Sequence, residues 1–292
     1  MRQSLMAALL LTPLFSASPA LAQNKADSPF VWTGKITAGA WLRVQSIRGP
    51  IHVIPSSGDQ TEVRAEIRND GDDEIIVQAR TVGKDILICA YSKEDECDEE
   101  GTHHHGHDRH SRADITVRLG KGTKIDASTG NGDLTVDGAG NDVRVSSGNG
   151  VVRVASVDGR VSASSGNGDI TVTGASGPTF ATTGNGRVSV TTQNGPVNAS
   201  SGNGDIEVTM SNLKDEGDMH FSTGNGRIIV TVPPSFTGQL ETDTGNGSIR
   251  TDFAITVTGS LSKHHLRGQI GTGDRRIHMS TGNGDLELRR GT

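Results

Sequence analysis

The chain has 292 residues with a formal net charge of −6, and 39 of the residues are Gly while only nine (Trp 2, Tyr 1, Phe 6) are aromatic. Gly, Val, Thr, Ser and Asp favour turns and strands, and side chains bulky enough for a large helical core are scarce. The composition therefore argues against a helical bundle and a doubly wound α/β enzyme. The negative charge argues against a broad nucleic-acid-binding surface.

Residues 1–22 have the pattern of a secretory signal peptide. Arg2 is a basic start, Leu5 to Phe15 form a short apolar stretch, and Ala20-Leu21-Ala22 is a small-residue cleavage site before Gln23. The apolar stretch is too short to span a membrane well. We expect an exported chain with no transmembrane segment after cleavage, located in the periplasm, outside the cell or on its surface. The competing interpretation is a buried N-terminal helix.

The N-terminal third, residues 23–112, contains strand-like segments with a loose period. They are 36–44, 49–53, 61–67, 75–79 and 86–90, and Gly49-Pro50-Ile51-His52-Val53 resembles a degenerate copy of the repeats that follow it. We expect these strands to cap the repeat stack, because a bare end would expose an unpaired strand edge. Residues 113–292 are expected to continue the same stack.

Two cysteines, Cys89 and Cys97, lie in this N-terminal region. An exported chain enters an oxidising compartment, so a disulfide between them is expected. The alternative is a pair of free thiols in a flexible loop.

An acidic and His-rich segment, residues 91–112, interrupts the strand pattern. Six acidic residues precede five histidines, His103, His104, His105, His107 and His110. In an extended chain His103, His105 and His107 project to one side, and Asp108 or His110 completes a set of ligands for zinc or nickel. The alternative is a solvated insertion that binds metal only adventitiously.

The dominant pattern is a Gly-Asn-Gly repeat. It occurs at 130–132, 148–150, 166–168, 184–186, 202–204, 224–226, 245–247 and 282–284. The first five copies are 18 residues apart, and the later spacings of 22, 21 and 37 are interpreted as inserted loops. A fixed period of this size is typical of a repeat architecture.

Each 18-residue period divides into two nines, each with one strand and one turn. In every nine the fifth and seventh positions are apolar or small and the sixth is mostly polar, which is the alternation of a half-buried strand. The seventh position is Val in the Gly-Asn-Gly nines and mostly Ala in the others. The pattern predicts an all-β fold, a flattened parallel β-solenoid with two short strands per turn and a thin core between a Val-lined and an Ala-lined sheet.

An antiparallel meander is the competing fold, because Asn-Gly between strands is a strong hairpin signal. A solenoid explains the constant spacing better, since identical residues then stack on one corner. We expect a hydrogen-bonded ladder of side-chain amides from Asn131, Asn149, Asn167, Asn185 and Asn203.

The Ser/Thr-Gly-Asn-Gly-Asp-Ile/Leu-x-Val units at 129–136, 165–172, 201–208 and 281–288 resemble those of a bacterial β-strand-repeat family whose members are named putative adhesins. The strand Ile88-Cys89-Ala90-Tyr91 with the later Cys97, and the Ile270-Gly271-Thr272-Gly273 segment, are also alike. The resemblance covers nearly all of the mature chain and implies the fold. It implies no activity, because the family has none established.

Catalytic and calcium-binding patterns are missing from the sequence. Aligning Gly132 with the calcium-binding nonapeptide repeat places Leu134 where a ligand Asp belongs, and an apolar side chain cannot bind a hard cation. The carboxylates Asp133, Asp169 and Asp205 lie on one corner, but they are two rungs, about 10 Å, apart, which is wide for polysaccharide cleavage. We therefore predict that the chain is not an enzyme and keep a polysaccharide-acting β-helix as the third interpretation.

The sequence favours an exported structural or adhesive interaction module of the cell envelope or surface. Its expected partners are envelope or surface proteins, glycans or identical copies, bound through a flat sheet face or through the segments Tyr91–Arg112, Met210–His220 and Thr258–Gln269. The second interpretation is an envelope metal-binding protein centred on His103–His110.

Overall fold

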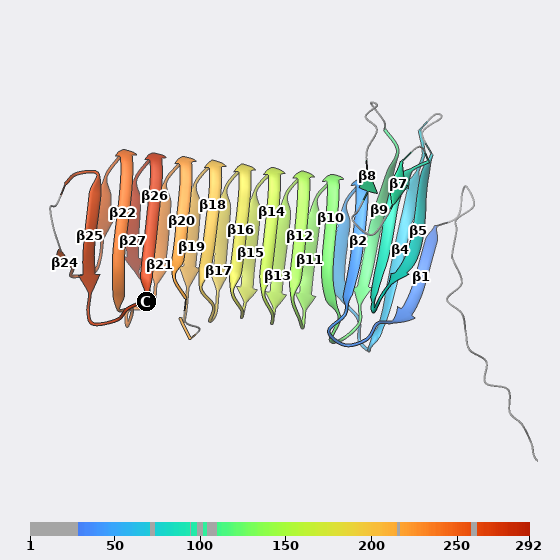
Figure 1. Cartoon of the computed structure of the whole chain (residues 1–292), viewed down its shortest axis with the longest axis horizontal. Coiled ribbons are helices and arrows are strands. Elements are labelled where there is room, and N and C mark those ends of the chain that lie inside the picture. The colour runs from blue at the N-terminus through green and yellow to red at the C-terminus, as the bar shows by residue number, and fades with distance from the viewer. Residues whose placement is uncertain are drawn as a thin grey trace, which may run out of the picture.

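The chain forms a long row of strands arranged as two facing sheets (Figure 1). The computed structural model describes residues 29–70, 74–93, 95–97, 102–103, 110–214, 217–257 and 262–292. The predicted signal peptide, residues 1–22, lies outside the described residues.

One sheet, named here the Val sheet, has twelve strands. In spatial order they are β1 (Phe30–Lys35), β4 (Gln60–Arg68), β9 (Arg112–Leu119), β3 (Ile51–Pro55), β11 (Leu134–Ala139), β13 (Val152–Val157), β15 (Ile170–Ala175), β17 (Val188–Thr192), β19 (Ile206–Met210), β21 (Ile228–Val232), β27 (Leu286–Arg290) and β23 (Ile249–Thr251).

The facing sheet, named here the Ala sheet, has thirteen strands. In spatial order they are β24 (Thr256–Val257), β25 (His265–Ile270), β22 (Gly238–Asn246), β26 (Arg276–Asn283), β20 (Met219–Asn225), β18 (Val197–Asn203), β16 (Thr179–Asn185), β14 (Val161–Asn167), β12 (Val143–Asn149), β10 (Lys124–Asn131), β2 (Trp41–Arg48), β6 (Asp85–Ser92) and β5 (Ile75–Val82). A separate pair is formed by β7 (Glu96–Cys97) and β8 (Thr102–His103).

Neighbouring strands of the repeat region pair in parallel, and the paired residues occupy equivalent positions of successive repeats. Val143 of β12 lies beside Val161 of β14, and Leu134 of β11 lies beside Val152 of β13. The predicted all-β parallel solenoid is therefore confirmed, and the antiparallel meander is wrong for this region. Among the described strands, antiparallel pairing occurs only at the two ends of the stack and between β7 and β8.

The core is a thin layer between the two sheets. The inward side chains of the Val sheet, such as Val154 and Val172, and those of the Ala sheet, such as Ala163 and Ala181, are almost completely buried. Because Ala faces Val across much of the stack, the sheets pack closely without aromatic residues. Larger side chains enter the core toward the two ends of the stack, with Phe30 at the N-terminal end and Phe221 and Met279 toward the C-terminal end.

The spatial order of the rungs differs from their order in the chain. The last rung in sequence, β26–β27, lies between β20–β21 and β22–β23, as the strand labels in Figure 1 show for the Ala sheet. The 37-residue spacing before the last repeat therefore reflects an exchange of rungs, which corrects its interpretation as a simple inserted loop. A similar exchange places β2–β3 beside β10–β11.

Both ends of the stack are covered by strands that depart from the repeat. β1, β4 and β5 extend the N-terminal end, while β24 and β25 extend the Ala sheet at the other end. β2 to β6 correspond to the five segments expected from the sequence, except that the first begins at Trp41 instead of Ile36, and β1 was not expected. Within the described residues, no helix is long and apolar enough to cross a membrane.

Neighbouring rungs approach so closely at the Gly-Asn-Gly corner that a side chain at the last Gly has no room. A Cβ built on Gly150 would lie 2.0 Å from the carbonyl oxygen of Gly132. We expect Gly150→Ala to lower the free energy of unfolding by about 1–3 kcal/mol, because backbone must shift. Thermal unfolding followed by circular dichroism measures this. Gly58→Ala is the matched control, since a Cβ at Gly58 meets nothing within 4 Å, and an equal loss in both variants would contradict the explanation.

Candidate functional site

The repeated corner is built by four residues, each with a separate physical role. The Ser or Thr before the Gly-Asn-Gly is buried, and its hydroxyl donates to the carbonyl of the last Gly of the preceding rung: Ser165 Oγ lies 2.9 Å from Gly150 O. A Cβ on the first Gly would collide with backbone, as at Gly166, where it would lie 2.5 Å from Gly148 O. Tight parallel stacking of the rungs thus requires a hydroxyl residue and two glycines at these positions of the Ser/Thr-Gly-Asn-Gly motif.

The Asn side chains of this corner form a continuous ladder on the surface. From Asn149 onward, each Nδ2 donates to the Oδ1 of the preceding Asn of the ladder at 2.7–2.8 Å. In spatial order the ladder consists of Asn131, Asn149, Asn167, Asn185, Asn203, Asn225, Asn283 and Asn246. The first five were expected from the 18-residue spacing. The last three were missed although their Gly-Asn-Gly copies were visible. The spacing departs from 18 residues before Asn225, and Asn246 and Asn283 stand in the opposite order in space from that in sequence.

A carboxylate occupies every second rung of the adjacent column. Asp133, Asp169 and Asp205 each accept a hydrogen bond from the backbone N–H of the residue one rung ahead, at 2.7–2.9 Å. Asp285 does the same with Ser248, and it preserves the alternation only in the spatial order of the rungs. Hydrogen bonds from the Ser248 backbone N–H and hydroxyl hold the pKa of Asp285 below its usual value.

These aspartates hold backbone rather than face one another. Ion pairs with Arg153 and Arg187, at 4.0 and 3.9 Å, further occupy Asp133 and Asp205. Because each carboxylate is committed to the neighbouring rung, the column does not form the close acid–base pair that glycoside hydrolysis needs.

The outer face of the Ala sheet carries a straight row of hydroxyl groups, named here the hydroxyl column. Neighbouring members lie side by side on adjacent strands, and two pairs are hydrogen-bonded at 3.0–3.1 Å. The column consists of Ser128, Ser146, Ser164, Thr182, Ser200, Ser222 and Ser280. At about 4.8 Å per rung, seven rungs extend about 29 Å.

A second outward row on the Ala sheet mixes charged, polar and aromatic groups. Phe180 is 37% exposed, and the Arg160 guanidinium lies over its ring at 5.4 Å. Burial raises the pKa of Asp126, which Arg144 and Arg43 oppose. Partial burial and the neighbouring His278 lower the pKa of His220. The face is therefore polar and includes the partly exposed ring of Phe180.

Each of the three segments expected to bind partners borders a hollow. Arg267, Gly268 and Gln269 help to line one of about 390 Å³, and His110 and Arg112 help to line one of about 430 Å³. The third hollow borders the segment Met210–His220. Loop residues 212–214 and 217–218 line it together with 233, 235–237 and 273–275, and its volume is about 710 Å³. Its lining carries both signs of charge, from Lys214 and Arg275 and from Asp218 and Asp274. Within the other two segments, residues 94, 98–101, 104–109 and 258–261 lie outside the described residues.

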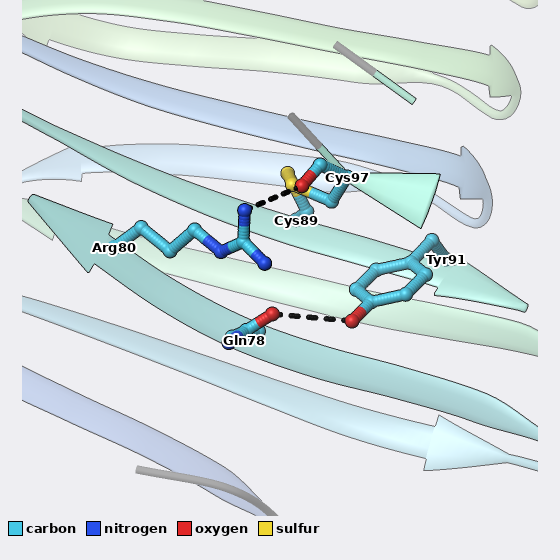
Figure 2. Close-up of a disulfide and its surroundings, with 5 residues drawn as sticks. All are labelled: Gln78, Arg80, Cys89, Tyr91 and Cys97. Atoms are coloured by element: carbon cyan, nitrogen blue, oxygen red, sulfur yellow. Dashed lines mark hydrogen bonds between the residues drawn. A yellow bond between two sulfur atoms is a disulfide. The ribbon is translucent and has the colours of Figure 1, made fainter. Parts of the chain in front are cut away.

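Cys89 and Cys97 form a disulfide at the N-terminal end of the Ala sheet (Figure 2). Arg80 donates to the carbonyl oxygen of Cys97 at 2.8 Å, and the Tyr91 hydroxyl donates to Gln78 at 3.1 Å. Closing a loop of about nine residues contributes roughly 2–3 kcal/mol in the chain-entropy model. The disulfide fixes the start of the acidic and His-rich segment to the sheet.

The predicted metal ligands of this segment are only partly described. The backbone of His103 lies in β8, and His110 is exposed beside β9. His105, His107 and Asp108 lie outside the described residues, so their arrangement stays a prediction.

An isosteric change tests the amide ladder. Asn185 both donates to Asn167 and accepts from Asn203, whereas Asn131 only accepts within the ladder, from Asn149. We expect Asn185→Asp to lower the free energy of unfolding by about 1 kcal/mol, since it replaces a hydrogen bond with two opposed oxygens. Asn131→Asp keeps its ladder bond and should cost less. Denaturant unfolding of both variants measures the difference, and equal stabilities would refute the ladder's contribution.

Comparison with known proteins places the chain in a family. The family model described as Toastrack DUF4097 matches residues 98–289. No curated protein matches the chain. Similar solved structures include a "putative cell adhesion protein" from Clostridium sporogenes (11% identity, TM-score 0.29, covering 90% of this chain and 100% of that chain). Two others are "putative adhesins" from Bacteroides fragilis (11%, 0.46, 91% and 98%) and Parabacteroides merdae (10%, 0.46, 91% and 98%). From the family match, which spans most of the sequence and all of the Gly-Asn-Gly rungs, the chain belongs to the Toastrack DUF4097 family.

Proposed function

We propose that the chain is an exported, non-catalytic interaction module that acts at the bacterial cell surface and binds a repeating partner along the outer face of the Ala sheet. The observation that carries this proposal is the hydroxyl column, which presents seven Ser and Thr side chains on successive rungs. A flat row of this kind suits weak contacts repeated many times, and such contacts reach high avidity when the partner is itself a repeat.

A glycan chain is the partner class that this face fits best. Hydroxyl and amide groups are hydrogen-bonding partners for sugar hydroxyls, and Phe180 offers an exposed ring for the apolar face of a sugar. Envelope proteins and further copies of the chain are the other candidates. The Val sheet has an outward face of different composition, with Arg153, Glu207 and Arg250 among Ser and Thr side chains.

The mapping of the Asp column supports a non-catalytic role. Asp133, Asp169 and Asp205 bind backbone N–H groups of the next rung, so these carboxylates, which were the candidates for polysaccharide cleavage, have a structural task. A metal-binding role for the segment His103–His110 stays a second proposal, because five histidines follow six acidic residues there.

Protease accessibility on cells tests the location. If the proposal holds, protease added to intact cells digests the protein as completely as protease added after permeabilisation. A periplasmic protein processed from the same signal type serves as the control and must stay protected until permeabilisation. Protection of this chain on intact cells would contradict a surface role.

Two pairs of substitutions test the binding face. Ser164→Arg with Thr182→Arg places two cations on neighbouring rungs of the hydroxyl column, and we expect it to reduce binding of the purified chain to envelope fragments at least tenfold. Thr171→Arg with Ser189→Arg is the matched control, because these residues occupy neighbouring outward positions of the Val sheet. A sedimentation binding assay measures both, and equal binding by the two double variants would place the site elsewhere.

A further inference from the structure

The outer face of the Ala sheet ends, toward the C-terminal end of the stack, in a cluster of histidines and carboxylates. Glu241, Asp243 and His278 each offer a ligand atom, and the three atoms lie within 4.8 Å of one another. All three side chains are partly exposed, at 42%, 45% and 34%. The cluster is far in sequence from the segment His103–His110.

Two more histidines adjoin this cluster. They are His265, whose Nδ1 lies 2.6 Å from Asp243 Oδ1, and His220. Within the cluster itself, His278 Nδ1 lies 3.8 Å from Glu241 Oε2. The ring of His220 stacks on that of His278, with centroids 4.8 Å apart and planes inclined by 3°. The carboxylate and imidazole groups are therefore held in position from neighbouring strands.

The exchanged rung assembles this cluster. β26 lies between β20 and β22, which places His278 beside Glu241 on one side and His220 on the other. β25 pairs with β22 in antiparallel fashion and places His265 opposite Asp243. In a stack that followed chain order, β22 would pair with β20, and His278 would not separate His220 from Glu241. Repeat counting in the sequence therefore could not have found the cluster.

We propose that Glu241, Asp243 and His278 bind a divalent transition metal of the zinc class on the outer face of the Ala sheet. One imidazole nitrogen and two carboxylate oxygens are a set of ligand types that Zn²⁺ accepts, and three protein ligands leave one position of a tetrahedron open. Ligand atoms around zinc lie about 3.4 Å apart for metal–ligand distances near 2.1 Å. Side-chain rotations that shift each ligand atom by about an ångström bring the three atoms to that spacing, and the strands need not move.

The surroundings favour this arrangement over a hard cation. His265 hydrogen-bonds one oxygen of Asp243 and so orients its carboxylate, as groups that hydrogen-bond to metal ligands do. Arg267 pairs in register with Glu241 and Arg276 lies two residues before His278, and their positive charges oppose every divalent cation equally, so the preference for zinc comes from the imidazole ligand. Ca²⁺ takes six to eight oxygen ligands, which two carboxylates beside an imidazole do not supply.

Zinc titration by calorimetry tests the proposal on the full mature chain and on a variant that removes the other candidate site. In that variant, called the five-Ser variant, Ser replaces each of the five histidines His103, His104, His105, His107 and His110. We expect it to bind one Zn²⁺ per chain and Ca²⁺ not at all. Adding His278→Gln to the five-Ser variant should weaken zinc binding at least tenfold, and Asp243→Asn should do so as well.

His52→Gln is the matched control. His52 also lies on an outer sheet face and contacts a carboxylate, Asp137, at 3.0 Å, but it belongs to no group of three ligands among the described residues. We expect this substitution to leave zinc binding unchanged. Circular dichroism checks that each variant is folded, and the absorption spectrum of bound Co²⁺ reports whether imidazole coordinates the metal.

Two results would overturn the proposal. The first is a folded five-Ser variant that binds no zinc, which would assign all uptake to the His-rich segment. The second is zinc binding that His278→Gln and Asp243→Asn leave unchanged. Neither result bears on the binding face proposed above, because the cluster lies outside the rungs substituted in that test.

Discussion

The fold depends on how closely successive rungs approach at the Gly-Asn-Gly corner. Backbone of one rung lies so near the next that the corner glycines have no space for a Cβ. The same proximity brings each Ser or Thr hydroxyl within reach of a Gly carbonyl and each Asn amide within reach of the next. One geometric constraint thus selects all four residues of the motif, and it fixes the register of both sheets because each rung must repeat the path of its neighbour.

Fixed register has consequences for the surface as well as for the core. Inward positions alternate with outward ones along each strand. Because equivalent residues of successive repeats lie side by side on neighbouring strands, each repeated position of the sequence forms a straight column. The thin core of Val facing Ala follows from the inward columns. The amide ladder, the hydroxyl column and the alternating aspartates follow from the outward and corner positions. The proposed binding face is therefore a direct product of the register that holds the stack together.

Most of this architecture was predictable because its causes are local and periodic. The inward positions, the two strands per turn and the Val and Ala faces were expected from residue spacing, and the parallel sheets confirm them. Rung exchange was not predictable, since every rung carries the same corner and can stack on any other. Asp285 illustrates the limit: its role in the alternating column is visible only when β27 is placed before β23. The cluster of Glu241, Asp243 and His278 depends on the same exchange.

Exchange of the last rung also determines when the molecule can be completed. β22 and β23 precede β26 and β27 in the sequence. They nevertheless connect to the rest of the stack only by pairing with β26 and β27. The C-terminal end of the solenoid therefore cannot grow by simple addition of rungs in the order of the sequence. Residues 276–292 are therefore required to complete this end of the stack. A polypeptide truncated before residue 276 lacks the strands with which β22 and β23 pair.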